Sequence, residues 1–475
     1  MNETRISASV MDRYPKPDVQ KIDELLRHEV SLCDRKIVVL DDDPTGVQTV
    51  HDISVYTDWS KESIEQGFME EGILFYILTN SRGFTVDQTT KAHREIAANV
   101  DDVARSLGKD YLIISRGDST LRGHYPLETM LLSEERKKLS GGDTDGEIIC
   151  PYFKEGGRFT IDDVHYVKYG DELVPCGETE FAADETFGYK SSNLKEYVFE
   201  KTKGTFAVSD CKSVSLDMIR SMDYEGIENI LMSVKDFEKV IVNAIDDSDV
   251  KVFATALHRV MRKGKNFTIR SAAALVKAIG GISDKPLLTR GEMVTLKNKA
   301  GGIIVVGSHT KKTTAQLEEL KKISDIEFIE MNSDLVLEEG ALLRETERVL
   351  KIEEECIKQG KTVCVSTKRT LLKVENDTPE AALVRSVEIS DALQSLVGKL
   401  EVTPAFVVAK GGITSSDVGT KALKVKKAKV LGQIQPGIPV WQTGAESRFP
   451  GTPYVIFPGN VGDIDTLYKA VKVLI

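Results

Sequence analysis

Short apolar runs recur along this chain, and most of them end in a polar or glycine-rich turn. Helical patterns separate the runs, which is typical of βα units around a mostly parallel sheet. In the first half of the chain the runs are residues 37–40, 73–78, 111–114, 148–150, 206–208 and 239–243. The apolar residues of 250–280 that follow have helical spacing, so we expect helices there to close a first domain.

A second series of apolar runs begins at residue 302. Its members are residues 302–306, 326–330, 362–366, 405–408 and 454–457. Between the two series, a cluster of Gly, Ser, Asp and Pro at 280–286 interrupts regular structure. We therefore predict an α/β fold of two domains with mostly parallel sheets and an interdomain cleft. The predicted segments are an arm and helix at 1–30, a first domain at 31–285, a linker at 286–299 and a second domain at 300–475.

The composition excludes several classes of protein. A net charge of −11 argues against a nucleic-acid binder, which needs a basic face to neutralise phosphates. No apolar run approaches the ~20 residues of a membrane span, and the polar N-terminus lacks the apolar core of a signal peptide. The 6 cysteines are scattered without a Cys-x-x-Cys pair, as expected of reduced thiols. We expect a cytoplasmic protein that binds neither nucleic acid nor membrane, and a homodimer is left open.

Three carboxylates follow the first apolar run. Asp41, Asp42 and Asp43 stand before Thr45 and Gly46, at the strand end where open α/β sheets bind their ligands. Like charges this close cost stability unless a metal, a cationic side chain or a polyhydroxylated ligand offsets them. The turn is either such a site or a solvated loop with helix-capping residues, and the segment alone does not decide between them.

A second polar turn, residues 115–124, follows the run 111–114. It contains Arg116, Asp118, Ser119 and Arg122, and arginine is suited to bidentate recognition of carboxylate or phosphate. The alternative is an N-capped helix with solvated arginines. So many polar groups at one strand end favour a site.

Other polar clusters of the first half give weaker signals. Residues 79–83 end the run 73–78 with Ser81 and Arg82, and on their own they are better explained by a plain βα turn. Asp162, Asp163 and His165 have the chemistry of metal ligands, but we favour a loop or interface role for them, as for residues 178–181.

Three small-residue turns follow strands of the second half. They are residues 307–310, 409–416 and 458–463. Glycines let the backbone approach a phosphate, and exposed N–H groups and hydroxyls can bind it. The P-loop and the dinucleotide-binding fingerprint are both absent from the sequence. Together the turns indicate a nucleotide site of another kind.

Together these segments resemble the four-carbon acid sugar kinase family, bacterial enzymes that phosphorylate threonate, erythronate or oxo-tetronate with ATP. The family's Asp-Asp-x-Thr-Gly corresponds to residues 42–46, and its Asp-Ser-Thr-Leu-Arg-Gly to residues 118–123. Its Gly-Gly-x-Thr corresponds to residues 411–414 and its Gly-Asn-x-Gly to residues 459–462. The motifs occur in the family's order.

The resemblance implies that the first domain binds the sugar acid and that the second binds ATP with Mg²⁺. It implies substrate contacts from Asp42, Asp43, Ser81, Arg82, Arg116, Asp118, Ser119 and Arg122. It implies nucleotide contacts from Ser308, Gly411, Gly412, Ile413, Thr414, Gly459, Asn460 and Gly462. The expected catalytic base is Asp118 or Asp43, and the metal ligands are not identified.

The chain departs from the family pattern at two sites. Arg116 stands where the family usually has Lys, and Phe457 and Pro458 replace a Lys-Ser pair that often precedes Gly-Asn-x-Gly. These departures motivate one alternative, a sensor that binds both ligands without catalysis.

A second alternative is a phosphatase of the haloacid dehalogenase type. Asp41-x-Asp43-x-Thr45 imitates the nucleophile motif of that superfamily, and Thr79 imitates its second motif. Its acidic motif would be Asp463-x-Asp465, in the other predicted domain. This reading leaves residues 118–123 and 411–414 without a role.

Overall fold

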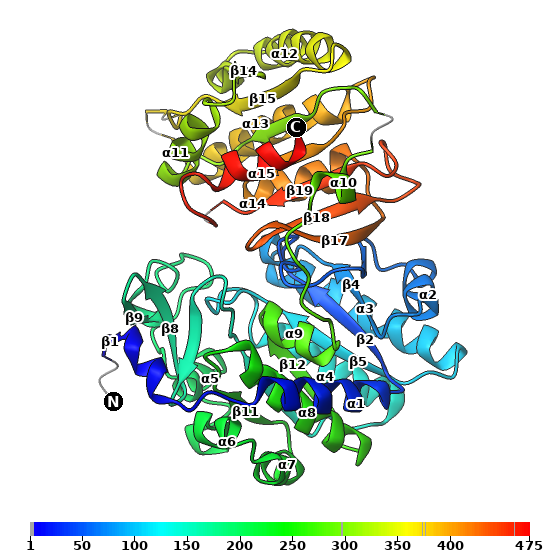
Figure 1. The fold of residues 1–475 in the computed structure, drawn as a ribbon, viewed down its shortest axis with the longest axis vertical. Coiled ribbons are helices and arrows are strands. Elements are labelled where there is room, and N and C mark those ends of the chain that lie inside the picture. The colour runs from blue at the N-terminus through cyan, green and yellow to red at the C-terminus, as the bar shows by residue number, and fades with distance from the viewer. Residues whose placement is uncertain (1–3, 296–297, 373, 376, 460) are drawn as a thin grey trace. The chain divides into compact units, whose positions relative to one another are not determined.

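The computed structural model describes residues 4–295, 298–372, 374–375, 377–459 and 461–475. The chain forms two compact units (Figure 1). Unit 1 consists of Met1–Gly46 and Asp58–Asp284, and unit 2 of Val47–Thr57 and Lys285–Ile475. A short segment of the N-terminal half thus belongs to unit 2, which the sequence analysis did not predict.

A parallel sheet forms the centre of unit 1. Every neighbouring pair of its strands is parallel. In spatial order the strands are β10 (Cys211–Val214), β11 (Glu238–Val242), β6 (Gly146–Cys150), β12 (Phe267–Ser271), β5 (Tyr111–Arg116), β2 (Lys36–Asp41) and β4 (Leu74–Leu78). Continuous apolar strands suit a sheet that helices cover on both faces.

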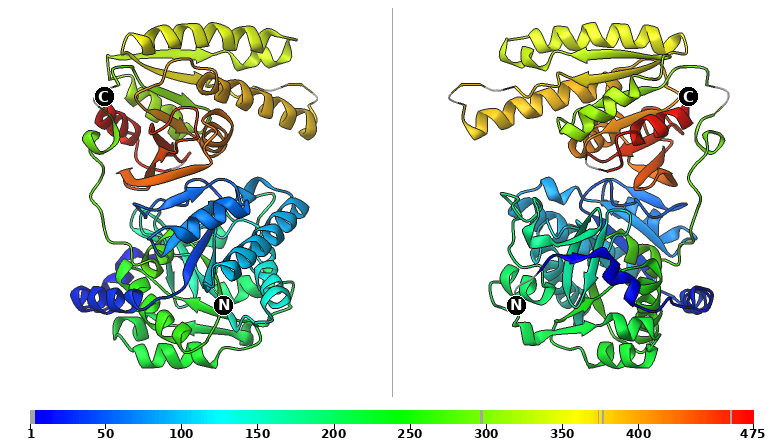
Figure 2. Two further views of the ribbon diagram at one scale, coloured as in Figure 1. Left: turned by 90° about the vertical axis from the view of Figure 1, so that its right-hand side faces the viewer. Right: turned by 60° about the vertical axis from the view of Figure 1, so that its left-hand side comes forward.

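Two groups of helices lie on opposite faces of this sheet (Figure 2). The first group packs around α8 and contains α1 (Val19–Ser31), α6 (Leu216–Arg220), α7 (Tyr224–Ser233), α8 (Asp247–Arg262) and α9 (Ala273–Ile279). The second consists of α2 (Lys61–Met69), α3 (Val86–Ser106) and α4 (Leu127–Ser140). A capping box of Thr85 and Gln88 begins α3.

Unit 1 also contains a small antiparallel sheet that the sequence analysis missed. Its strands, in spatial order, are β1 (Ile6–Ser7), β9 (Glu172–Pro175), β8 (Val164–Tyr169) and β7 (Arg158–Ile161). The helix α5 (Leu194–Lys201) packs beside it, because Tyr197 of α5 and Val167 of β8 share one core cluster with Leu121. This cluster joins the small sheet to the turn after β5.

The sheet of unit 2 is antiparallel on one side and parallel on the other. Its order is β3 (Ser54–Tyr56), β17 (Lys427–Gln435), β18 (Ile438–Thr443), β19 (Pro453–Phe457), β16 (Val407–Lys410), β13 (Ile303–Val306), β15 (Thr362–Thr367) and β14 (Ile326–Met331). The strands from β3 to β19 pair antiparallel, and those from β19 to β14 pair parallel.

The helices of unit 2 also form two groups. One contains α10 (Arg290–Met293), α11 (Lys311–Leu320) and α15 (Thr466–Leu474), and the other α12 (Ala341–Lys358), α13 (Pro379–Gly398) and α14 (Gly412–Asp417). Figure 2 shows the N-terminal half of α13 extending away from the sheet, where Leu383, Val384 and Val387 are exposed.

Three local expectations differ from the structure. Residues 206–208 lead into the short 3₁₀ helix Val208–Asp210, and the strand begins only at Cys211. Residues 250–280 contain the buried strand β12 between two helices. This strand was not predicted, because a strand in the middle of a covered sheet does not show the alternating pattern by which strands are recognised. The expected linker 286–299 is not free, since Leu288, Met293 and Val294 belong to the hydrophobic core of unit 2.

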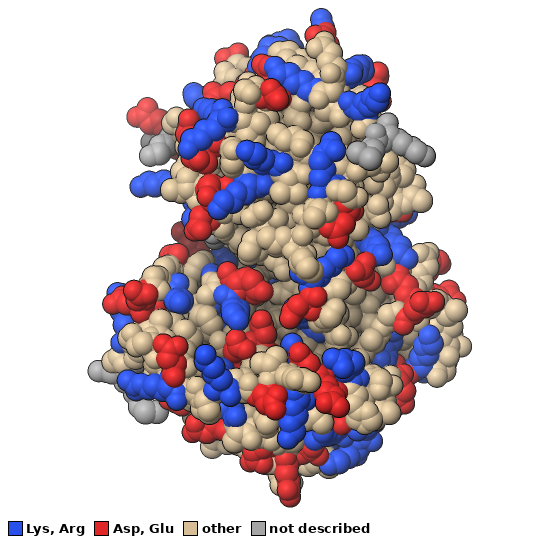
Figure 3. Space-filling view, in the orientation of Figure 1, with Lys and Arg blue, Asp and Glu red and all other residues tan. Residues whose placement is uncertain are grey.

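The surface shows no separation of charge on the face drawn in Figure 3, where Lys and Arg are interspersed with Asp and Glu. In the part of the chain that the structure describes, no helix is both long enough and apolar enough to span a membrane.

Candidate functional site

The topology of unit 1 brings the predicted polar turns to one edge of the sheet. The strands β12, β5, β2 and β4 are parallel neighbours, so their carboxyl ends lie side by side. Asp41 at the end of β2 pairs in register with Arg116 at the end of β5. The acidic turn and the arginine turn therefore meet at this edge.

Asp41 lies beneath this edge and does not reach its surface. Its side chain is 1% exposed, and its Oδ1 accepts a hydrogen bond from Nη1 of Arg116 at 3.1 Å. A Cβ atom at position 46 would come within 2.0 Å of the carboxylate, so only glycine fits there. Burial raises the pKa of Asp41 to about 7 against the opposing effect of Arg116.

Asp42 and Asp43 share one arginine. Arg82 binds Asp42 through two bonds, from Nη2 to Oδ1 at 2.7 Å and from Nε to Oδ2 at 3.1 Å. Its Nη1 donates to Oδ2 of Asp43 at 3.1 Å. Burial raises the pKa of Asp42 despite Arg82. Burial acts in the same direction on Asp43, but Arg82 and the hydroxyl of Thr45 outweigh it, so this pKa is lowered.

Asp118 forms a second carboxylate–arginine pair. Its Oδ2 accepts bonds from the Thr120 hydroxyl and from Nε of Arg122, the latter at 2.7 Å. Burial opposes its ionisation, yet Arg82 and Arg122 hold its pKa well below the usual range. A Cβ at Gly123 would lie 3.4 Å from Oδ2 of Asp42, so this turn abuts the acidic turn.

The arginine turn is held in a strained conformation. Leu121 has a φ of 69°, a left-handed conformation that is uncommon for leucine. Its carbonyl accepts bonds from the Tyr197 hydroxyl at 2.9 Å and from Nη2 of Arg270 at 3.4 Å. Arg270 lies in β12, which the sequence analysis did not predict, so it was missed as a supporting residue.

Ser81 and Ser119, which were predicted to contact the substrate, make contacts with other residues of the protein. Ser81 is fully buried and donates from Oγ to Oε1 of Glu128 at 2.7 Å, below the surface of the site. Ser119 is 8% exposed, and its carbonyl lies 2.8 Å from Nε2 of His165.

The cluster at 162–165 is a turn with a supporting histidine. Asp162 and Asp163 have φ values of 50° and 64° and connect β7 to β8 as a tight hairpin, for which this conformation is usual. His165 is fully buried, with Nδ1 3.0 Å from Oγ1 of Thr160, and burial lowers its pKa to about 4. Among the described residues no group of three His, Cys, Asp or Glu is placed to hold a metal.

The three small-residue turns of unit 2 also meet. They follow β13, β16 and β19, which are parallel neighbours in the order β19, β16, β13. A Cβ at Gly411, where φ is 125°, would lie 3.3 Å from the Cβ of Ser308. A Cβ at Gly459 would lie 3.7 Å from Oγ of Ser308, and one at Gly307 would overlap Oγ1 of Thr414 at 2.2 Å. The glycines thus let the turns approach one another closely.

Lys410 is a residue of this site that the sequence analysis did not select. It ends β16 directly before Gly411 and is fully buried. Its Nζ donates to the carbonyls of Pro458 at 2.8 Å and Gly459 at 3.2 Å, and it lies 4.2 Å from the centre of the Phe457 ring. Burial lowers its pKa to about 7. Its position before the paired glycines was the available signal.

The other predicted nucleotide residues differ in exposure. Gly412 has open space where a Cβ would lie, and Ile413 is 71% exposed. A Cβ at Gly462 would lie 2.7 Å from Thr466, so this glycine shapes the turn before α15. Asn460 lies outside the described residues.

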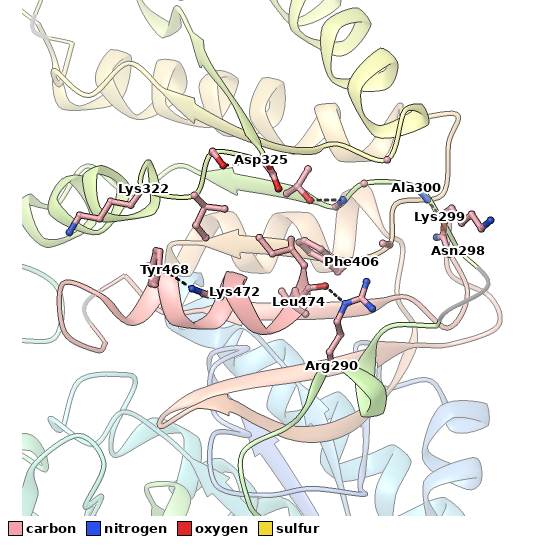
Figure 4. Close-up of a pocket in the computed structure, with 18 residues that line it drawn as sticks. Arg290, Asn298, Lys299, Ala300, Lys322, Asp325, Phe406, Tyr468, Lys472 and Leu474 are labelled. Carbon is pink, nitrogen blue, oxygen red and sulfur yellow. Dashed lines mark hydrogen bonds between the residues drawn. The ribbon is translucent and has the colours of Figure 1, made fainter.

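A cavity of about 570 Å³ lies at the opposite edge of the unit 2 sheet (Figure 4). It is lined by Gly302, Thr362 and Ala405, at the amino ends of β13, β15 and β16. Two of its cations are already bonded, since Arg290 donates to the carbonyl of Leu474 at 3.0 Å and Lys472 to the Tyr468 hydroxyl at 3.1 Å. Because ligands of parallel sheets bind at carboxyl ends, the small-residue turns remain the better candidate.

Two known domain families match the chain. A sugar-binding N-terminal domain matches residues 37–279, and a nucleotide-binding C-terminal domain matches residues 303–467. The chain belongs to the four-carbon acid sugar kinase family. Unit 1 therefore contains the family's sugar-binding domain and unit 2 its nucleotide-binding domain, and the architecture is that of a sugar-acid-kinase-like protein.

Two solved structures have the same two-domain α/β fold as this chain. The Haemophilus influenzae protein HI1011, of the DUF1537 family, is 16% identical with a TM-score of 0.60, over 92% of this chain and 100% of its own. A Salmonella typhimurium LT2 protein described as a proposed tRNA synthase is 15% identical with a TM-score of 0.65, over 92% and 98%. The comparison with curated proteins gives no match.

The residues at the two departures from the family pattern make identifiable contacts in the structure. Arg116 neutralises buried carboxylates, with Nη1 3.1 Å from Asp41 and 3.6 Å from Asp42. Phe457 and Pro458 both contact Lys410, whose ammonium lies at the strand end where the family's Lys-Ser is missing.

Proposed function

We propose that this protein is an ATP-dependent kinase that phosphorylates a hydroxyl of a four-carbon sugar acid such as threonate, erythronate or oxo-tetronate. The observation that carries the proposal is the pairing of two different sites in one chain. Unit 1 presents carboxylates and arginines at the carboxyl ends of four parallel strands, and unit 2 presents small-residue turns at the carboxyl ends of three.

The sugar-acid site offers both kinds of group that such a ligand needs. Carboxylates such as Asp42 and Asp43 accept hydrogen bonds from hydroxyls, and guanidinium groups donate to a carboxylate. Asp118 is our candidate for the base. Both of its protein bonds are made by Oδ2, so among the described residues Oδ1 has no hydrogen bond and is available to a substrate hydroxyl.

The low pKa of Asp118 keeps it ionised at neutral pH, so it orients a hydroxyl and takes its proton late. A strong base is not required, because catalysis of phosphoryl transfer depends mainly on positioning and on neutralising charge.

The turns of unit 2 fit the phosphates of ATP. Gly412 leaves space beside the backbone, and Gly411 lets the turns approach one another closely. The hydroxyls of Ser308 and Thr313 lie 3.0 Å apart in the same group of turns. The ammonium of Lys410 stands below the same turns, and a bound anion would favour its charged form.

We propose that Mg²⁺ accompanies the nucleotide. The described residues contain no cluster of three metal-binding side chains, which fits an ion held mainly by phosphates and one or two carboxylates. Bound there, Mg²⁺ would neutralise charge on the transferred phosphoryl group.

The phosphatase alternative is not favoured. Its nucleophile would be Asp41, which is 1% exposed and bonded to Arg116. Its acidic motif would lie at Asp463, which belongs to unit 2.

The test is ADP release with Mg-ATP across a panel of four- to six-carbon sugar acids. We expect turnover with at least one four-carbon acid. Binding of ATP and an acid without ADP release would indicate a sensor instead. A phosphate ester trapped on Asp41 without an ATP requirement would revive the phosphatase.

A further inference from the structure

The arginines around the sugar-acid site are not equally available to a ligand. Most of them face a carboxylate of the protein: Arg82 with Asp42 and Asp43, Arg116 with Asp41, Arg122 with Asp118, and Arg270 with Glu128. A guanidinium that already neutralises a carboxylate offers little net charge to another anion. An acid substrate therefore needs a cation whose charge is still uncompensated.

Arg158 is such a cation. It opens β7 and is partly buried, and within the described chain its side chain forms neither an ion pair nor a hydrogen bond. Its Nε is buried without a partner. A Cβ at Gly156 would come within 3.1 Å of its Nη1, so the glycine leaves room for the guanidinium. A buried hydrogen-bond donor without an acceptor costs stability unless a ligand supplies the acceptor.

The small antiparallel sheet holds Arg158 beside the arginine turn. Thr160 of β7 contacts Nδ1 of His165 on β8, and Nε2 of His165 lies 2.8 Å from the carbonyl of Ser119. Backbone bonds between Phe153 and Arg158, at 2.8 and 3.1 Å, close the loop that precedes β7. The position of Arg158 relative to residues 118–123 is therefore fixed by buried contacts.

Phe181 connects Arg158 to Arg122. The guanidinium carbon of each arginine lies 5.2 Å from the centre of the Phe181 ring. Arg122 binds Asp118 through Nε, and its Nη1 lies 3.8 Å from Asp184, beyond hydrogen-bond distance. The terminal amino groups of Arg122 are thus also available. Burial and the nearby Arg122 lower the pKa of Arg158, although Asp118, Tyr169 and Glu180 oppose them.

We propose that Arg158, aided by the terminal amino groups of Arg122, binds the carboxylate of the substrate and makes unit 1 specific for acids over neutral sugars. This inference rests on the proposed function only in taking the ligand of unit 1 to be a sugar acid. It assigns the carboxylate to a residue outside every motif of the sequence, and it leaves Asp42, Asp43 and Asp118 to the hydroxyls.

The test measures binding to the full chain without nucleotide, by isothermal titration calorimetry. The probes are threonate, erythronate and the neutral amide of each acid. We expect the wild type to bind an acid more tightly than its amide. Arg158→Gln should weaken acid binding by about 10- to 100-fold and leave amide binding unchanged, because one charge-assisted contact is lost. Arg158→Lys should bind the acid with intermediate affinity.

Arg136→Gln is the matched control. Arg136 also has a buried Nε without a partner and lies 5.4 Å from the centre of an aromatic ring, that of Tyr111. Tyr111 begins β5, so this arginine lies at the opposite edge of the sheet from the site. Arg136→Gln should bind acid and amide as the wild type does, and equal melting temperatures would show that all variants are folded.

The outcomes separate this inference from the kinase proposal. Acid binding that depends on Arg158, without ADP release on addition of Mg-ATP, would refute the kinase and support the carboxylate role. ADP release with an unchanged KM for the acid in Arg158→Gln would support the kinase and refute the carboxylate role of Arg158. Absence of acid binding by the wild type, or equal affinity for acid and amide, would overturn the role of Arg158.

Discussion

Asp118 is the carboxylate of the proposed sugar-acid site with one oxygen bonded and the other available. Replacing it with Asn keeps the size of the side chain but removes the group that we propose takes the hydroxyl proton. We expect Asp118→Asn to lower kcat about 100-fold or more, the usual contribution of a general base. Steady-state ADP release with the best four-carbon acid measures this effect.

Asp184→Asn is the control for that variant, because Asp184 is the other carboxylate near Arg122, at 3.8 Å. It should retain nearly full kcat. Full turnover in Asp118→Asn would exclude Asp118 as the base.

Asp41 makes the stability of the protein depend on pH. Its pKa is about 7 in the folded chain and ordinarily 3.8, because burial disfavours the ionised form. Between these values the folded state holds a proton that the unfolded state has lost, so this group makes stability fall as pH rises from about 4 to 7. Asn cannot ionise, so Asp41→Asn should remove that part of the loss.

From pH 5 to pH 8 the free energy of unfolding should fall by roughly 2 to 3 kcal/mol more in the wild type than in Asp41→Asn. Urea denaturation at several pH values measures it. Parallel curves for the two proteins would contradict the raised pKa of Asp41.

The sequence predicted the residues of the site that follow strands directly. Asp42, Asp43, Asp118 and Arg122 were selected because apolar strands and polar turns are local features, and their contacts with a substrate stay a prediction. Arg158 was not selected, because its role depends on Phe181, a partner that is distant in sequence. Lys410 precedes the paired glycines of a predicted turn, but its contact with Pro458 is not visible in the sequence. No local pattern contains such a contact.

At the level of elements, the small-residue turns of unit 2 make different demands on their glycines. Gly411 needs a φ of 125°, whereas Gly412 has an ordinary φ and nothing within 4 Å of where a Cβ would lie. A methyl group at 412 is therefore free of strain and would occupy the space that we assign to phosphate. We expect Gly412→Ala to weaken Mg-ATP binding at least about tenfold without lowering the melting temperature, since Ala favours the helix that begins there.

Gly291→Ala is the control for this prediction. Gly291 lies in α10 of the same unit, also with an ordinary φ and with open space at the Cβ position. The variant should change neither nucleotide affinity nor melting temperature. Unchanged affinity in Gly412→Ala, measured by calorimetry with Mg-ATP, would remove this turn from the nucleotide site.

Elements were predictable where hydrophobic periodicity was strong. The runs that became β2, β4, β5, β13 and β15 are continuous and apolar. The strand β12 was hidden because its sequence, Phe267–Ser271, mixes apolar and polar residues that are all buried. The hairpin of β17 and β18 and the sheet of β7 to β9 were missed because antiparallel pairing depends on register between strands rather than on βα spacing.

At the scale of the whole molecule, the chain enters unit 2 twice. Val47–Thr57 leaves unit 1 after the acidic turn and supplies β3, which pairs with β17 through Tyr56 and Lys427. Asp52 of this segment binds Lys429 at 3.0 Å and Lys285 at 3.3 Å. A strand of three residues gives almost no sequence signal, so the predicted boundaries treated residues 31–285 as one continuous domain.

This arrangement predicts which unit is destabilised by a mutation in residues 47–57. Val55 is 1% exposed in β3, and truncation of a buried valine to Ala costs about 2 kcal/mol. Because β3 belongs to unit 2, Val55→Ala should speed amide hydrogen exchange in β17 by roughly tenfold or more and leave β5 of unit 1 unchanged.

Val38→Ala is the matched control, since Val38 is equally buried in β2, only 17 residues earlier by number. It should speed exchange in β5, which pairs with β2, and leave β17 unchanged. Exchange in the full chain, followed by mass spectrometry of peptides, separates the two responses. If Val55→Ala loosened β5 as much as β17, residues 47–57 would have to be assigned to both units.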